Sequence, residues 1–331
     1  MIITRTPFRI SFFGGGTDYP DWFKDHGGVV LSTTIDKYCY ISCRKLPPFF
    51  EHKHRIVYSQ IETVQFNHEI KHPSVKAVFE WADITEGLEV HHDGDLPARS
   101  GIGSSSSFTV GMIKAIYALR SKMISQYELA RDAIHIEQNI IGENVGSQDQ
   151  VAAAFGGFNR ISFSNDGNFK VSPVIISKER QLDLNAHLML YFTGTSRIAD
   201  QIARSKIDNL PFRQNELHLM KSMVDETIEI LANGKIPIKQ FGQMLHESWK
   251  LKRSLSNRVS TPEIDTLYQI AIDNGAIGGK ILGAGGGGFM LLFAEPHRQP
   301  AIRNVLSSLV HVEFKFETSG SQIVLYQPNE L

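Results

Sequence analysis

The sequence has few cysteines, almost no net charge and no long apolar run. Its 331 residues include two cysteines, with 34 basic against 35 acidic side chains. The near balance of charge excludes the basic surface typical of a nucleic-acid-binding protein. No stretch reaches the roughly 18 apolar residues of a membrane-spanning helix, and the first residues lack the basic and apolar pattern of a signal peptide. We therefore expect a cytoplasmic protein without nucleic-acid or membrane partners.

The two cysteines lie four residues apart in a predicted strand. At about 3.3 Å per residue, Cys39 and Cys43 are separated by about 13 Å, which is beyond the reach of a disulfide. Two free thiols are typical of a protein from a reducing compartment, which agrees with the expected cytoplasmic location.

Glycine is present in ordinary amount but is unevenly distributed. Of the 27 glycines, 13 lie in three short windows, at 14–16, 101–103 and 275–288. Between these windows strand and helix patterns alternate, and no period of 20 to 50 residues repeats, which excludes a solenoid or a propeller. The patterns predict strands over 2–13, 29–44, 57–66, 88–92, 186–193, 289–294 and 323–326.

Helices are predicted where apolar residues recur at helical spacing. One such pattern begins at Phe108. Another spans 126–141, carries Ile140 on its apolar face and ends at Gly142. Further helices are predicted over 217–231, 238–251 and 262–274.

One segment is a strong candidate for a domain boundary. The turn-forming residues Ser164-Asn165-Asp166-Gly167 come just before the stretch from Val171 to Pro173. This stretch divides residues 1–170 from residues 171–331, and both parts mix strands with helices. The sequence therefore predicts two domains in the α+β class.

The segment LPARSGIGSSSS, at 96–107, has the composition of a phosphate-binding loop. Gly101 and Gly103 let backbone N–H groups turn toward one point, and the start of the following helix adds unpaired N–H groups. Arg99 lies within the loop, and the segment contains no acidic residue. Four serine hydroxyls, at 104–107, can bind phosphate oxygens or Mg²⁺. The alternative is a flexible loop before a serine-capped helix.

A second glycine pattern, G-x-G-x-x-G, occurs at Gly283, Gly285 and Gly288. In dinucleotide-binding folds this pattern follows a strand and opens a helix. Here we expect a helix before the pattern and a strand after it, and this order excludes a dinucleotide site.

Three acidic residues are candidates for catalysis or binding. Glu137 projects from a largely apolar helix face, where either Mg²⁺ or an arginine would have to satisfy a buried carboxylate. Asp149, in GSQDQ, is placed either to accept a proton from a substrate hydroxyl or to cap a helix. Asp18, in GGGTDYP, is either a turn residue or a ligand for sugar hydroxyls.

Three separated segments together resemble one family, the GHMP small-molecule kinases. The segments are TPFRISFFGGGTDYP at 6–20, LPARSGIGSSSS at 96–107 and GGKILGAGGGGFMLLF at 278–293. They occur in the order of the family's motifs and cover essentially the full length of the chain. The resemblance implies a two-domain GHMP kinase fold, with an N-terminal ATP-binding domain like domain 2 of ribosomal protein S5 and a ferredoxin-like C-terminal domain. The active site would lie between the two domains.

The resemblance also implies residue roles, with ATP and Mg²⁺ as cofactors. Asp149 matches the aspartate that orients or deprotonates the attacking hydroxyl, and Arg9 matches the basic residue near the transferred phosphoryl group. Ser105 and Glu137 would hold Mg²⁺, and Asp18 matches a sugar-binding aspartate. Contacts with the ATP phosphates are expected from Arg99, Gly101, Gly103, Ser104, Ser105, Ser106 and Ser107, and contacts with the substrate from Gly15, Gly16, Thr17, Gly285, Gly286 and Gly287.

Within the family, the GGGTDYP, GSQDQ and TGTSR segments look most like those of sugar 1-kinases that act on D-glycero-D-manno-heptose 7-phosphate, with fucokinases as near relatives. Such an enzyme would phosphorylate the anomeric hydroxyl to give the 1,7-bisphosphate, which feeds the synthesis of nucleotide-activated heptose. Galactokinases carry Glu-His where this chain has Gly15-Gly16, and this departure argues against galactose.

A sugar phosphate acceptor also needs a partner for its own phosphate. Arg197 follows a predicted strand and offers a guanidinium, although a surface arginine in a turn fits the sequence equally well. Two alternatives stay open for the protein, namely a kinase for fucose or another hexose and a non-catalytic sensor of ATP and sugar. The presence of both Glu137 and Asp149 favours the enzyme. The sequence leaves open whether the chain forms a homodimer.

Overall fold

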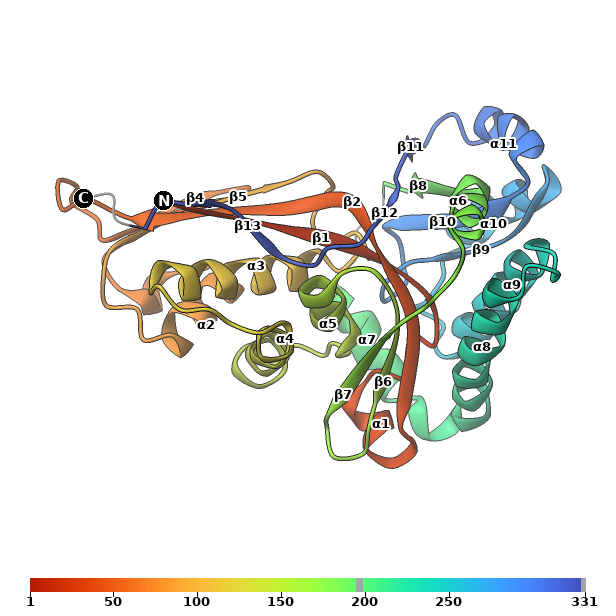
Figure 1. The fold of residues 1–331 in the computed structure, drawn as a ribbon, viewed down its shortest axis with the longest axis horizontal. Coiled ribbons are helices and arrows are strands. Elements are labelled where there is room, and N and C mark those ends of the chain that lie inside the picture. The colour runs from red at the N-terminus through yellow and green to blue at the C-terminus, as the bar shows by residue number, and fades with distance from the viewer. Residues whose placement is uncertain (195–198, 329–331) are drawn as a thin grey trace.

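The computed structural model describes residues 1–194 and 199–328, which form two sheets (Figure 1). The first sheet is built on two long antiparallel strands, β1 (Ile2–Phe13) and β2 (Gly28–Lys45). Its main strand order is β13-β1-β2-β5-β3-β4, and β6, β7 and β12 extend it alongside β2. The other strands are β3 (His54–Val57), β4 (Ile61–Val64), β5 (Leu88–Gly94), β6 (Phe158–Phe163), β7 (Phe169–Pro173), β12 (Phe316–Glu317) and β13 (Gln322–Tyr326).

Helices cover one face of the first sheet (Figure 1). The central one, α3, lies closely on β1 because Gly111 has no side chain, and a Cβ there would come within 2.8 Å of the Thr6 hydroxyl. The Thr4 hydroxyl donates to the Gly111 carbonyl at 3.0 Å. The helices of this part are α1 (Pro20–His26), α2 (Pro73–Trp81), α3 (Ser104–Leu119), α4 (Gln126–His135) and α5 (Gln148–Phe155), with a π-helix at Ile136–Ile141 and a 3₁₀ turn at Asn67–Glu69.

The second sheet has the order β11-β8-β10-β9, with antiparallel neighbours. In chain order this is 4-1-3-2, the arrangement of a split β-α-β unit, and it confirms the expected ferredoxin-like domain. The strands are β8 (Leu188–Phe192), β9 (Ala276–Ile281), β10 (Phe289–Ala294) and β11 (Val310–Val312). The helices are α6 (Lys178–His187), α7 (Ala199–Ile207), α8 (Gln214–Ala232), α9 (Lys239–Ser254), α10 (Pro262–Asp273) and α11 (Gln299–Val305), with 3₁₀ turns at Leu210–Phe212 and Pro296–Arg298.

Aromatic contacts join the two parts of the molecule. Phe12 and Phe13 of β1 each meet the Phe241 ring of α9 edge to face, with ring centroids 5.4 Å apart. All three side chains are fully buried. The end of β1 is therefore held against the second sheet's helices, which fixes how the two halves face each other.

The end of the chain returns to the first sheet. β12 pairs with β2, and β13 pairs with β1 through partners such as Ile3 and Leu325. β7 also belongs to this sheet, so the predicted boundary at 170/171 falls inside a strand. The edge strands of a sheet have free N–H and C=O groups that can pair with a segment distant in the chain. Local sequence does not show such pairing, and the boundary was therefore predicted too early.

The single strand predicted over 57–66 is instead the hairpin of β3 and β4, and three further local predictions differ from the structure. Helix α3 begins at Ser104, four residues before the predicted start, because Gly103 in the left-handed region (φ 75°) turns the chain into the helix. The second predicted helix becomes a π-helix over its last turn, which rotates Ile140 outward to 38% exposure while Glu137 stays buried. A strand, β9, immediately precedes the G-x-G-x-x-G pattern at 283–288, where we expected a helix. A strand still follows the pattern, so dinucleotide binding stays excluded.

Cys39 and Cys43 are both free and buried on β2. Burial raises the pKa of both thiols, to about 12 for Cys43. Among the described residues, no helix has the length and apolar character needed to cross a bilayer.

Candidate active site

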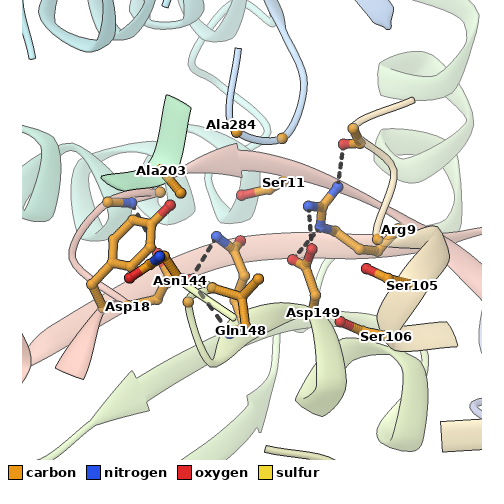
Figure 2. Close-up of a pocket in the computed structure, with 18 of the residues that line it drawn as sticks. Arg9, Ser11, Asp18, Ser105, Ser106, Asn144, Gln148, Asp149, Ala203 and Ala284 are labelled. Atoms are coloured by element: carbon orange, nitrogen blue, oxygen red, sulfur yellow. Dashed lines mark hydrogen bonds and ion pairs between the residues drawn. The ribbon is translucent and has the colours of Figure 1, made fainter. Parts of the chain in front are cut away.

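A cavity of about 350 Å³ lies where β1, the start of α3 and the start of α5 face helices α7 and α9 (Figure 2). It therefore takes side chains from both halves of the molecule. Most of the residues predicted for the site line it, namely Arg9, Gly15, Gly16, Asp18, Arg99, Gly101, Gly103, Ser104, Ser105, Ser106 and Asp149.

Several predicted contact residues lie behind the cavity wall instead. The Thr17 hydroxyl is buried and bonds the Gly14 carbonyl at 2.8 Å, so it closes the glycine turn. The Ser107 hydroxyl donates to the Pro7 carbonyl at 2.9 Å. In the third glycine window, Gly283 and Ala284 line the cavity, whereas Gly285, Gly286 and Gly287 do not. Arg197 lies outside the described residues.

Arg9 and Asp149 form a two-point ion pair in the middle of the cavity. The Arg9 Nε and Nη2 atoms donate to Asp149 Oδ1 and Oδ2, each at 2.7 Å, and Nη1 donates to the Gly101 carbonyl at 2.7 Å. Arg9 is 3% exposed and the Asp149 side chain 25%, so the guanidinium is enclosed while the aspartate stays open to the cavity. A Cβ at Gly103 would lie 3.2 Å from Arg9 Cγ and 3.4 Å from Asp149 Oδ2. The segment at 96–107, here called the phosphate loop, therefore packs closely against Arg9 and Asp149.

The phosphate loop presents the start of α3 to the cavity. Gly101 and Gly103 have positive φ, and Arg99 shares this conformation at φ 59°. The Arg99 N–H donates to the Ser104 hydroxyl at 3.0 Å, which holds the loop closed. The first N–H groups of a helix have no partner within the helix. The first turn of α3, with its serine hydroxyls and the positive end of the helix dipole, is thus available to an anion.

Glu137 lies behind the phosphate loop on the π-helix. The Ser106 hydroxyl donates to Glu137 Oε2 at 2.8 Å, and the Gln150 amide donates to the same oxygen. Glu137 Oε1 makes no direct hydrogen bond among the described residues, and the nearby Thr109 hydroxyl, which donates to the Ser105 carbonyl at 3.1 Å, acts to lower the pKa of the acid. Burial raises the pKa of Glu137 to about 7. The sequence paired Ser105 with this acid, whereas the structure bonds it to Ser106 and leaves Ser105 on the cavity wall.

These groups fit a magnesium ion. Mg²⁺ prefers oxygen ligands and is usually bound through one or two carboxylates together with substrate phosphates. The Ser106 hydroxyl and the buried carboxylate of Glu137, whose Oε1 atom makes no direct hydrogen bond among the described residues, meet that need beside the phosphate loop. No cluster of three His, Cys, Asp or Glu side chains occurs in the described part of the chain, so the structure offers this ion two protein groups and not a complete cage.

Asp18 occupies the other end of the cavity. Its Oδ1 atom accepts the Gly16 N–H at 2.9 Å, and its Oδ2 atom accepts the side-chain amide of Gln148 at 2.9 Å. Gly146 makes this packing possible, because a Cβ there would come within 1.9 Å of Asp18 Oδ2. Burial raises the pKa of Asp18. Gln148, which sequence reasoning did not single out, lies beside Asp149 in GSQDQ and also lines the cavity.

Three buried lysines were missed by the sequence analysis. Lys206, Lys252 and Lys280 line the cavity at 4%, 4% and 2% exposure. Lys252 Nζ donates to the Ile281 and Gly283 carbonyls, and Lys280 Nζ donates to the Phe12 carbonyl, all at 2.7 Å. Desolvation lowers the pKa of each, to about 8 for Lys206 and about 7 for Lys280. Lys252 lies at helical spacing from the buried residues Leu245 and Trp249 of α9. This spacing is visible in the sequence and could have predicted that Lys252 is buried.

Two domain models and a curated relative match this chain. Residues 69–157 match the GHMP kinases N terminal domain, and residues 214–311 match the GHMP kinases C terminal domain. The chain is 33% identical over 308 residues to the D-glycero-alpha-D-manno-heptose 7-phosphate kinase of Campylobacter jejuni, a match that covers 90% of this chain and 91% of that protein.

Two solved structures share the fold at lower sequence identity. A D-glycero-D-manno-heptose 1-phosphate kinase from Bacteroides thetaiotaomicron superposes with a TM-score of 0.80 at 24% identity, covering 98% of this chain and 99% of that one. Lactococcus lactis galactokinase complexed with galactose gives 0.72 at 19% identity, covering 97% and 94%. Together with the Campylobacter jejuni match, which spans both halves of the molecule, these findings establish that the chain belongs to the GHMP kinase family of ATP-dependent kinases.

Proposed function

We propose that this kinase transfers the γ-phosphoryl group of ATP to the anomeric hydroxyl of D-glycero-D-manno-heptose 7-phosphate, giving the 1,7-bisphosphate. The observation that carries the proposal is the order of groups along one cavity. In Figure 2, Ser105 and Ser106 lie at one end, Asp149 in the middle and Asp18 at the other end. The relationship to the Campylobacter jejuni enzyme supports the choice of acceptor.

The ATP phosphates are assigned to the phosphate loop. Phosphoryl transfer depends on in-line positioning and on neutralising the phosphate oxygens more than on covalent help from the protein. The unpaired N–H groups at the start of α3, the hydroxyls of Ser104 and Ser105, and Arg99 supply that environment. Arg9, held by Asp149 and Gly101, is positioned to face the transferred group.

Magnesium is assigned to Glu137 and the serine hydroxyls at the start of α3. Ser106 already bonds to Glu137, and Ser105 faces the cavity one residue earlier. When bound, the ion would neutralise charge on the β- and γ-phosphate oxygens. The raised pKa of Glu137 shows that its carboxylate is poorly solvated without a cation.

Asp149 is assigned to the acceptor hydroxyl. Arg9 holds both carboxylate oxygens in fixed positions, and each oxygen keeps a further lone pair that can accept a bond from the hydroxyl. The acidity of an anomeric hydroxyl exceeds that of an ordinary alcohol, and the carboxylate of Asp149 is assigned to orient this hydroxyl and take its proton. Asp18 and Gln148 are assigned to hydroxyls on the remainder of the sugar.

Of the glycines expected to contact the substrate, Gly15 and Gly16 keep that role in the proposal, and Gly285 is reassigned. Gly15 and Gly16 line the cavity and leave room that larger side chains would fill. Gly285 contributes by packing, since a Cβ there would lie 2.6 Å from the Val259 carbonyl. Because ATP and sugar phosphates are supplied in the cytoplasm, we expect the reaction to take place there.

A panel of acceptors tests the proposal. Purified protein would be assayed for ADP release with Mg·ATP and with heptoses, hexoses, fucose and their phosphates, and ³¹P NMR would locate the new phosphate. Heptose 7-phosphate is expected to give the highest kcat/KM, with the new phosphate on the anomeric carbon. A higher kcat/KM for fucose or an unphosphorylated hexose would overturn the choice of acceptor, and binding of ATP without turnover of any sugar would indicate a sensor.

A further inference from the structure

Lys206 is a buried cation without a hydrogen-bond partner among the described residues. It lies on α7 at 4% exposure and lines the cavity. The nearest defined contact of its ammonium is the Tyr19 ring, whose centroid lies 5.2 Å away. A buried charge is costly unless it is paired and hydrogen-bonded, and an ammonium has three hydrogens to donate. An anion bound in the cavity would supply the acceptors that the Lys206 ammonium lacks.

The other two cavity lysines differ from Lys206 in this respect. Lys252 holds the carbonyls on either side of the turn after β9, and Lys280 holds the end of β1. Their ammonium groups therefore stabilise the cavity wall. Lys206 makes no such bond to the backbone, so its charge is available to a ligand.

The neighbouring carboxylates already accept hydrogen bonds from other groups. Lys206 interacts electrostatically with Asp18, Asp149 and Arg9. Both oxygens of Asp149 are bonded to Arg9, and both oxygens of Asp18 accept N–H groups from Gly16 and Gln148. Neither acid lies within 4.0 Å of the Lys206 ammonium as an ion pair. The acids attract the cation without saturating its donors.

Lys206 belongs to the acceptor end of the cavity. In Figure 2, Ala203, one turn before Lys206 on α7, lies at the same end of the view as Asp18, and Ser105 and Ser106 lie at the other end. The Lys206 ammonium contacts the ring of Tyr19, the residue after Asp18. In heptose 7-phosphate the anomeric hydroxyl and the phosphate occupy opposite ends of the molecule. An acceptor that presents its hydroxyl to Asp149 would therefore direct its phosphate away from the phosphate loop, toward α7.

We propose that Lys206 recognises the phosphate that the acceptor already carries, an inference that rests on the proposed function. The phosphate loop serves the anions of ATP, and a second phosphate dianion at the other end of the cavity needs its own donor. The cavity lining carries five basic side chains (Arg9, Arg99, Lys206, Lys252 and Lys280) and three acidic ones (Asp18, Glu143 and Asp149). The ammonium groups of Lys252 and Lys280 bond the backbone, whereas that of Lys206 does not. Lys206 is in this view a residue that selects phosphorylated sugars over free ones.

The test compares two substitutions at this position. Lys206→Met removes the charge and keeps the apolar stem, whereas Lys206→Arg keeps a charge. Lys250→Met, at an exposed lysine of α9 that bonds Glu247, is the matched control. Each variant would be assayed with heptose and with heptose 7-phosphate at saturating Mg·ATP. Thermal melting would confirm that each is folded.

We expect Lys206→Met to raise KM for heptose 7-phosphate about 10- to 100-fold, the usual effect of losing a hydrogen bond to a charged group. Its kcat/KM for unphosphorylated heptose and its KM for ATP should stay within about twofold of the wild type. Lys206→Arg should recover part of the loss, and Lys250→Met should match the wild type.

Two results would overturn the inference, and they are distinguishable. If the wild type prefers heptose 7-phosphate and Lys206→Met keeps that preference, or loses both acceptors equally, Lys206 does not read the phosphate while the proposed function stands. If the wild type itself prefers an unphosphorylated sugar, the proposed acceptor is wrong and the role of Lys206 falls with it.

Discussion

The guanidinium of Arg9 and the carboxylate of Asp149 face each other as a two-point pair, with both N···O distances 2.7 Å. The two residues are 140 positions apart in the chain, and the pair joins β1 to the first turn of α5. This contact holds the group assigned to the transferred phosphate against the group assigned to the attacking hydroxyl. Substitutions at either residue should therefore affect catalysis before they affect nucleotide binding.

Replacing Asp149 by alanine should lower kcat by a factor of about 100 or more, the usual contribution of a positioned base. The KM for ATP should change little, because the phosphate loop holds the nucleotide. Steady-state kinetics with each substrate varied in turn would measure both effects.

The matched control for this substitution is Asp225→Ala. Asp225 bonds Arg160 through the same two guanidinium nitrogens, but the pair lies at an exposed surface. Such pairs contribute about 0–1 kcal/mol, so kcat should be unchanged. Near-normal turnover in Asp149→Ala would remove that residue from the mechanism.

Replacing Glu137 by glutamine should raise the Mg²⁺ concentration needed for half-maximal activity about tenfold, because an amide oxygen is a weaker ligand than a carboxylate. Glutamine keeps the size of the side chain and can still accept the Ser106 hydroxyl. Titration of activity with Mg²⁺ at fixed ATP would measure the change. Glu247→Gln, on the surface of α9, is the control, and an unchanged Mg²⁺ requirement in Glu137→Gln would contradict the metal assignment.

The affinity for a phosphorylated acceptor should fall as the pH rises past 8. A lysine is charged when protonated, and burial lowers the pKa of Lys206 to about 8, so its charged fraction declines above that pH. Its titration also senses the surrounding groups, which are Asp18, Tyr19, Asp149, Arg9, Lys252 and Lys280. KM for heptose 7-phosphate should therefore increase between about pH 8 and pH 9.

The Lys206→Arg variant separates this effect from other titrations. Arginine stays protonated throughout this range, so its KM should vary less with pH than that of the wild type. Parallel KM profiles for the two proteins would show that the titrating group is not Lys206.

Replacing Gly103 by alanine should impair activity by disturbing the fit of the phosphate loop. The residue has φ 75°, and its new Cβ would press on Arg9 Cγ at 3.2 Å. We expect a loss of about 1–2 kcal/mol in stability from the backbone alone and a loss of kcat/KM of tenfold or more. Gly167→Ala is the control, because Gly167 has φ 83° with open space around it. Gly167→Ala should lose a similar amount of stability and keep full activity. Equal activity in the two variants would show that the close packing of Gly103 against Arg9 is not needed for catalysis.

Sequence reasoning reached furthest where function depends on local backbone chemistry. The glycines and serines at 101–107 predict a helix start suited to an anion, and they lie on the cavity as expected, apart from the hydroxyl of Ser107. Sequence reasoning was less accurate where the role of a side chain depends on a segment distant in the chain. Thr17 was assigned to the substrate, but its hydroxyl closes a turn against the backbone of Val29.

By itself, then, the sequence determined the helix that opens at the phosphate loop, the acids beside it and the mixed α+β class, since these follow from residue spacing and local backbone preference. Only the tertiary structure decided that Ser106 bonds Glu137, because the hydroxyl selected depends on how α3 faces the π-helix. It also brought Lys206 to the cavity that holds Arg9 and Asp149. These side chains meet only because the two halves of the molecule pack together, and local sequence patterns do not predict that packing.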